Sequence, residues 1–146
     1  MTDFKKIIHN KKLLAIIINE KKYFKSGVDF VTPNFFPLQV GFMNHKANTM
    51  IKPHTHKNYL RKVYKTTEVL FVKKGSLRVD FYHNVKKYLF SNVVKKNHIL
   101  IIVQGSHGFK ALKNCLLIEV KQGPFSPHLD KVKFKAIDEK FIKIKK

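Results

Sequence analysis

Apolar residues recur along this chain in short runs, which are separated by glycine, asparagine, proline or paired lysines. Many runs alternate apolar and polar residues with the period of a β-strand, and turn residues return about every eight to twelve positions, as in a β-sandwich or barrel. The pattern therefore predicts an all-β fold. We expect a short helix or edge strand over 4–9, and strands over 13–19, 28–32, 38–45, 66–72, 77–82, 87–94, 98–104, 107–112 and 115–122.

Two pairs of neighbouring runs predict hairpins. The first joins 66–72 to 77–82 through KKGS, where Gly75 can supply a positive φ, and the second joins 107–112 to 115–122. Gln39 lies in an alternating strand and is a candidate to face the interior and bind a ligand. The basic, amphipathic C-terminal stretch KVKFKAIDEKFIKIKK fits a last strand, a helix or a frayed tail, and the sequence does not choose among them.

Length and composition favour one domain with a single core. The chain has 146 residues, of which 44% are hydrophobic and 13 are phenylalanine. It holds no uncharged apolar segment of about 18 residues or more, and its N-terminus lacks a small-residue cleavage site, so we expect a cytoplasmic protein without membrane insertion. The single Cys115, in the apolar stretch NCLLIEV, fits a buried thiol in a reducing compartment.

The formal net charge of +21 raises the question of nucleic-acid binding. Of the thirty basic residues, however, only Arg61 and Arg78 are arginine, and lysines occur in pairs along the whole chain. This distribution is typical of solvated lysines on loops and strand edges, where they also discourage edge pairing. We therefore do not expect nucleic acid as a specific partner.

Two histidines one residue apart mark the first candidate for chemistry. In an extended strand, His54 and His56 would project from the same face about 6 to 7 Å apart, a spacing that suits two ligands of one metal. Glu68 follows near the start of the next strand, so residues 51–82 predict a strand pair that carries a metal site. The alternative is that the His-x-His pattern arises by chance among eight histidines.

The order His-x-His, Glu, six residues and Gly75 resembles the first motif of the cupin superfamily, and NHILIIVQGSHGF, from Asn97, resembles the second motif. The resemblance implies an all-β, single-domain cupin with a double-stranded β-helix, or jelly-roll barrel. It also implies a metal bound by four residues. The chain departs from the family at several positions. Eleven residues separate His56 from Glu68, and Asn48 and Asn97 stand at family glycines. In the second motif Val103 stands at a family proline, Ala111 at a family asparagine, and His107 comes one residue early. The implied ligands are His54, His56, Glu68 and His107.

Further segments resemble a narrower group of small cupins from bacterial surface-polysaccharide gene clusters. They are LQVGFMNHKANTMIKPHTH, TTEVLFVKKGSLRVDFY, GSHGF and IEVKQGPFSPHLDKVKF. The resemblance implies one cupin domain over 1–146, with a core of about 28–134 and a basic C-terminal extension over 132–146. It also implies a place in surface-polysaccharide biosynthesis, and a cytoplasmic homodimer whose N-terminal strands offer unpaired edges.

Three functions stay open at this point. The first is a metal-binding isomerase or epimerase that acts on a sugar or nucleotide sugar, with Fe, Mn, Ni, Co or Zn as the divalent metal. The second is a non-catalytic sensor that binds a small polar ligand. The third is a metal-independent sugar-nucleotide ketoisomerase that uses histidine as acid and base. The candidate catalytic residues are His54, His107 and Tyr82, and the candidate ligand-binding residues are Arg61, Gln39 and Lys121.

Overall fold

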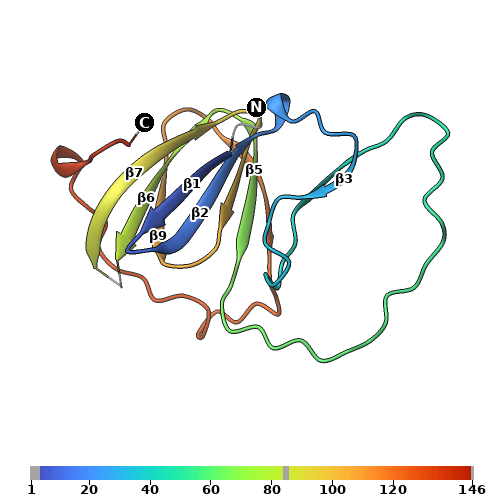
Figure 1. Cartoon of the computed structure of the whole chain (residues 1–146). Helices are drawn as coiled ribbons and strands as arrows, with labels where there is room; N and C mark the ends of the chain where they lie inside the picture. Colours follow the sequence, from blue (N-terminus) through green and yellow to red (C-terminus); the bar gives the residue numbers. More distant parts are fainter. Residues whose placement is uncertain (1–3, 84–85, 146) are drawn as a thin grey trace.

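The structure is a computed structural model that describes residues 4–83 and 86–145, and it is all-β with antiparallel sheets (Figure 1). Two 3-10 helices are present in the described chain, η1 (Glu20–Lys22) and η2 (Glu139–Phe141). The predicted strand positions are confirmed within a few residues, and residues 4–9 form a strand. The strands are β1 (Phe4–His9), β2 (Lys12–Asn19), β3 (Gly27–Phe30), β4 (Gly41–Asn44), β5 (Glu68–Lys74), β6 (Ser76–His83), β7 (Lys87–Lys95), β8 (His98–Ile102), β9 (Ser106–Ala111) and β10 (Leu116–Lys121).

The described strands form three sheets. Five strands form a sheet in the order β1-β2-β8-β5-β10, three form a sheet in the order β7-β6-β9, and β3 pairs with β4. β9 and β10 each have one neighbour among the described strands, so one edge of each is unpaired. Side chains from the two larger sheets share one apolar core, which includes Leu70, Val79, Phe81 and Leu100.

The central strands β2 and β8 of the five-stranded sheet are covered on both faces. Ala15 and Ile17 point to the core shared with β6 and β7, whereas Ile16 and Ile18 belong to a second cluster that includes side chains from 31–42. A strand with both faces buried has no polar face to show. This explains why LLAIII in β2 and ILII in β8 are continuous apolar runs and do not alternate.

The predicted hairpins over 66–82 and 107–122 are wrong. β5 pairs with β8 and β10, and β6 pairs with β7 and β9, so the chain changes sheet between β5 and β6 and again between β9 and β10. Gly75 makes the first corner with a φ of 80°, and a Cβ there would meet the backbone of Asn114 at the other corner. A glycine with positive φ therefore serves a sheet-to-sheet corner here instead of a hairpin turn.

The segment from 45 to 67 contains neither helix nor strand. It leaves the body of the molecule as a wide arc between β4 and β5 (Figure 1), and its side chains from 51 to 66 are exposed. The predicted strand around His54 and His56 is therefore wrong. Asn48, on this segment, has a φ of 65°, and Asn97, in the turn before β8, has a φ of 68°, so both adopt the left-handed conformation open to glycine.

The C-terminal segment after β10 returns along the three-stranded sheet. The backbone of Ser91 in β7 bonds with Lys143 and Lys145 through two hydrogen bonds of 2.8 Å, and Ser91 forms a parallel bridge with Ile144. Arg78, from β6, pairs with Asp80 and with Glu139. The tail is thus an extended strap that carries the short helix η2, and it covers the outer face of this sheet.

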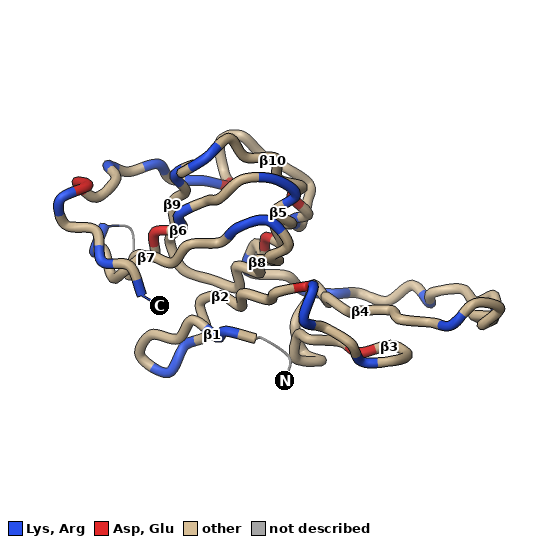
Figure 2. The backbone as a smooth tube through the Cα atoms, turned by 90° about the horizontal axis from the view of Figure 1, so that it is seen from above, with Lys and Arg blue, Asp and Glu red and all other residues tan. Residues whose placement is uncertain are grey.

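Lysine and arginine occur on most strands and on the connecting segments, as Figure 2 shows. In the described part of the chain, no helix has the length and apolar character needed to cross a membrane.

Candidate functional site

Glu68 and His107 meet at one end of the space between the two larger sheets. Glu68 begins β5 on the side of the strand that carries the core residues Leu70 and Val72. His107, in β9, pairs across the ladder with Phe81, which also faces that core. The His107 Nε2 and the Glu68 Oε2 are 3.0 Å apart, and the strand register therefore brings an imidazole and a carboxylate into direct contact.

The Glu68 carboxyl group is ionised. Its side chain is only 6% exposed, and burial alone would raise its pKa. The hydrogen bond from His107 and the favourable electrostatic interactions with His107, Lys131 and Lys121 outweigh burial and hold the pKa of Glu68 below its ordinary value.

A carboxylate can only accept a hydrogen bond, so Nε2 of His107 donates to it. In the neutral imidazole this leaves Nδ1 with a lone pair, and Nδ1 is buried without a hydrogen-bond partner. Leaving a buried polar atom unpaired costs about 1–3 kcal/mol. His107 therefore presents a nitrogen that a proton, a cation or a ligand group would stabilise.

The pair lies in the wall of a pocket of about 740 Å³. The closing segment after β10 is fastened beside the pair, since Lys131 lies 3.7 Å from Glu68 Oε1 and Lys121 lies 3.7 Å from Asp130. Phe109 supplies an apolar wall, with its ring 5.1 Å from that of His107. The pocket thus combines one acid-base pair, the ammonium groups of Lys121 and Lys131 near that pair, and an aromatic surface.

Tyr82 also lines this pocket, but it is buried and its hydroxyl is engaged. The Ile137 backbone N–H donates to the Tyr82 Oη at 3.2 Å, and the Tyr82 ring lies edge-on to Phe134 at 5.1 Å. Tyr82 therefore holds the C-terminal strap that closes one side of the pocket. A catalytic role for Tyr82 stays a prediction.

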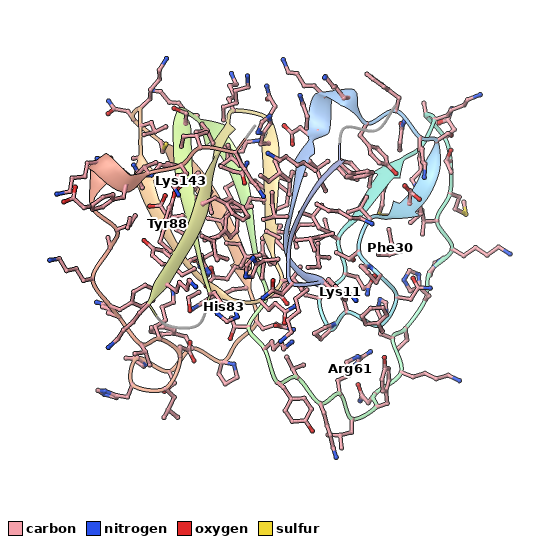
Figure 3. The ribbon with its side chains drawn as sticks, turned by 60° about the vertical axis from the view of Figure 1, so that its left-hand side comes forward. Lys11, Phe30, Arg61, His83, Tyr88 and Lys143 are labelled. Atoms are coloured by element: carbon pink, nitrogen blue, oxygen red, sulfur yellow. The ribbon has the colours of Figure 1, made fainter. Side chains whose placement is uncertain are left out.

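The two histidines of the first motif lie on the exposed arc. Their rings are 5.2 Å apart, and the Nδ1 of His54 donates to the Lys52 carbonyl oxygen at 2.9 Å. The guanidinium of Arg61 lies 3.7 Å from the ring centre of Tyr59, on the same arc, away from the sheets (Figure 3). The pocket around His107 is not lined by His54, His56 or Arg61.

Gln39 is not directed to the interior. Its side-chain amide donates to the backbone carbonyl oxygens of Phe36 and Pro33, at 2.8 and 2.9 Å, and it therefore stabilises the turn before β4. Of the predicted site residues, the structure brings together Glu68, His107, Tyr82 and Lys121.

The predicted four-residue metal centre is not assembled in this arrangement. Over residues 4–83 and 86–145, no group of three or more His, Cys, Asp or Glu side chains is placed to hold a metal ion. Glu68 and His107 supply two donors, but the Oε2 and the Nε2 bond to each other. The metal centre and its divalent cation stay a prediction.

Gln104 and Phe109 belong to the pocket, although the sequence patterns did not single them out for function. Gln104 lies two residues after the end of the buried strand β8. Its side-chain amide donates a hydrogen bond to the Leu13 carbonyl oxygen at 2.9 Å, and its Oε1 accepts one from Lys65 at 2.6 Å. Phe109 shares the strand parity of His107, and this parity was the signal that would have placed it beside the histidine.

Comparison of the chain with protein-family models, with curated proteins and with solved structures gives no match. The function is therefore inferred from the residues of the pocket and from the motif resemblance.

Proposed function

We propose that this chain is a sugar isomerase or epimerase of the cupin type, which acts on a sugar or sugar nucleotide in the pocket around His107. The observation that carries the proposal is the His107–Glu68 pair, in which the Nε2 is bonded to the carboxylate and the buried Nδ1 has no partner. A histidine whose one nitrogen is held by a carboxylate and whose other nitrogen has no hydrogen-bond partner has the arrangement of a general base, and a small rotation of the ring would bring the buried Nδ1 to the pocket.

The chemistry that fits this arrangement is proton transfer next to a carbonyl group. Nδ1 would take a proton from the carbon beside a keto group, the C–H electrons would form a C=C bond, and the carbonyl would become an enolate. Glu68 would stabilise the imidazolium that results, and Lys121 or Lys131 would stabilise the enolate oxygen. Return of the proton from Nδ1 to the same carbon on its other face, after the enolate has turned in the pocket, would complete an epimerisation. Return of the proton to the former carbonyl carbon, while the hydroxyl proton of the neighbouring carbon passes to the enolate oxygen and that hydroxyl becomes the new carbonyl, would complete an isomerisation.

The strand order supports a jelly-roll barrel for the six strands from β5 to β10. The central hairpin β6–β7 lies in one sheet, and the flanking pair β5–β8 lies in the other. β9 adds beside β6, and β10 adds beside β5. Such alternation of successive strands between two sheets is the pattern of a long antiparallel hairpin folded over on itself, as in jelly rolls and cupins.

The test is exchange of a substrate hydrogen. The protein would be incubated in D₂O with a panel of keto sugars and nucleotide sugars, and the deuterium incorporated at carbon would be measured by NMR. We expect His107→Asn to reduce the exchange rate by about 10²- to 10⁴-fold, the usual contribution of a positioned acid or base. His45→Asn changes an exposed histidine outside the pocket and is the matched control. Exchange that proceeds equally in His107→Asn would refute the proposal, and ligand binding without exchange would favour a non-catalytic sensor.

A divalent metal is the second candidate, and it is favoured by the proximity of His54 to His56 on the arc and by the unpaired Nδ1 of His107. If the arc folded over the pocket, these imidazoles and Glu68 would offer nitrogen and oxygen donors of the kind that Fe, Mn, Ni, Co and Zn accept. Metal analysis of the purified protein and of His54→Ala tests this. A metal content that is unchanged in that variant would contradict the site.

A further inference from the structure

A second pocket of about 500 Å³ adjoins the one around His107, and it has a different character. The two pockets share Lys65 and Gln104, whose side chains are joined by a hydrogen bond of 2.6 Å between the Nζ and the Oε1. The second pocket is bounded by the turn between β1 and β2, by residues 33–37 and by the end of the arc. Segments from three distant parts of the sequence therefore converge beside the candidate active site.

Two exposed aromatic rings line this second pocket. Phe35 is 84% exposed and Tyr64 is 87% exposed, so neither ring contributes much to the core. Phe35 is nevertheless held in place, because its ring lies edge-on to that of Phe36 at 5.2 Å, and Phe36 packs against the second core cluster. An anchored ring that keeps its face open offers a flat apolar surface on which a planar group can stack.

Lysines surround these rings. Lys11, Lys12, Lys62 and Lys65 line the pocket, and none of the described residues that line it is acidic. Lys11 has a φ of 61° at the tip of the β1–β2 turn, and Figure 3 shows it on the side of the sheet that faces the arc. Four ammonium groups without a neighbouring carboxylate in the pocket wall favour an anionic ligand.

We propose that the second pocket binds the nucleoside diphosphate half of a sugar nucleotide. The base stacks on Phe35 and Tyr64, and the phosphates are held by Lys62 and Lys65. This inference rests on the proposed function, because it assigns the sugar to the pocket around His107. Since Lys65 lines both pockets, a diphosphate bound there would extend from the base on one side to the sugar on the other.

The combined site has the dimensions and chemistry of a small-ligand site. Both pockets fall within the range of about 300–1,000 Å³ that is usual for such sites. Among the described residues that line the second pocket only two aromatic rings, those of Phe35 and Tyr64, are exposed for stacking, whereas a single-stranded nucleic acid is bound along a groove that tracks its backbone with successive aromatic platforms. One nucleotide is therefore the ligand that the pocket favours.

Calorimetric titration with ADP, UDP, dTDP and their sugar conjugates tests the inference, at moderate salt so that nonspecific attraction to lysine is screened. We expect Phe35→Ala to weaken nucleoside diphosphate binding by about 5- to 150-fold, from the usual strength of base stacking on an aromatic ring. Lys62→Gln should weaken it by up to about fivefold, the effect of one exposed charge contact.

Matched controls are Phe24→Ala and Lys87→Gln, which change an exposed residue of the same type outside both pockets and should leave the affinity unchanged. Because Phe35 and Lys62 are exposed, all four variants should fold like the parent, and circular dichroism checks this. A loss of affinity in Phe35→Ala together with retained affinity in Phe24→Ala would support the pocket.

The outcomes separate the two proposals. If a sugar nucleotide binds and His107→Asn weakens it while Phe35→Ala does not, the nucleoside subsite is wrong and the sugar site stands. If nucleoside diphosphates bind through Phe35, but attachment of the sugar adds no affinity and no hydrogen exchange is detected, the nucleoside subsite stands and the proposed isomerase function is wrong. Absence of any binding overturns both proposals. Tighter binding of a short single-stranded oligonucleotide through the same residues overturns the assignment to one nucleotide.

Discussion

Replacement of Asp80 by Asn tests whether the buried ion pair under the C-terminal strap stabilises the fold. Asp80 accepts two hydrogen bonds from Arg78, one from Nε at 2.7 Å and one from Nη2 at 2.9 Å, and a third from the Ser91 hydroxyl at 2.5 Å. The side chains of Arg78 and Asp80 are only 6% and 5% exposed. An asparagine of nearly the same shape removes the charge and directs an amide N–H₂ at a guanidinium that can only donate.

The expected loss of unfolding free energy is about 3 kcal/mol. Removal of one partner from a buried ion pair usually costs about 3–5 kcal/mol, because the other charge stays desolvated. The lower end applies here, since Glu139 still contacts the Arg78 guanidinium at 2.7 and 3.1 Å. Such a loss is a large fraction of the stability of a small domain, which is about 5–15 kcal/mol.

Urea denaturation of the parent and of Asp80→Asn measures this loss from the midpoint and the slope of the transition. The matched control is Asp138→Asn, at an exposed carboxylate that accepts from the Lys140 backbone at the start of η2 and whose capping bond asparagine can replace. The control should stay within about 0.5 kcal/mol of the parent. If Asp80→Asn loses no more than the control, the assigned role of the ion pair is wrong.

Three further predictions concern stability. Leu100→Ala, at a fully buried core position in β8, should lower the unfolding free energy by about 2–5 kcal/mol in urea, and a loss below about 1 kcal/mol would contradict close packing there. Gly75→Ala should lower the Tm, because its φ of 80° is strained for alanine and the new Cβ would meet the Asn114 backbone. An unchanged Tm would contradict the close approach of the two chain segments at this corner. The hydrogen bond from Arg78 lowers the pKa of Glu139 from 4.5 to about 2, so the stability it contributes is present above pH 4.5 and is lost as the pH falls toward 2. Glu139→Gln should lack this loss of unfolding free energy at acid pH. If the unfolding free energies of the parent and the variant depend on pH in the same way, the stabilising contact between Arg78 and Glu139 is contradicted.

The strands were predictable because their signals are local. β2, β5, β6 and β8 are marked by β-branched and aromatic residues between turn residues, and the structure has a strand at each. Their partners were not predictable in the same way. Alternation and a glycine turn are equally compatible with a hairpin and with a corner between two sheets, so the assignment at Gly75 failed.

The candidate site was predictable in part. Glu68 and His107 were identified through the motif resemblance, and the register of β5, β6 and β9 brings them together. His54 and His56 were expected on a strand, but residues 52–58 around them are polar and basic, and they lie on the exposed arc. The homodimer was predicted from free edges of the N-terminal strands. In the structure β2 is paired on both sides, and β1 keeps one open edge at which a second molecule could pair. The homodimer therefore stays a prediction.

The unpaired edges of β9 and β10 have a consequence for how this protein behaves in concentrated solution. Each edge presents backbone N–H and C=O groups that a strand from another molecule could extend, and β10 also exposes Leu116, Ile118 and Val120. At low ionic strength, the net charge of +21 keeps such molecules apart. Salt at about 1 M shortens the screening length to about 3 Å. Repulsion would then no longer oppose edge-to-edge polymerisation, so the protein should become less soluble as salt is added.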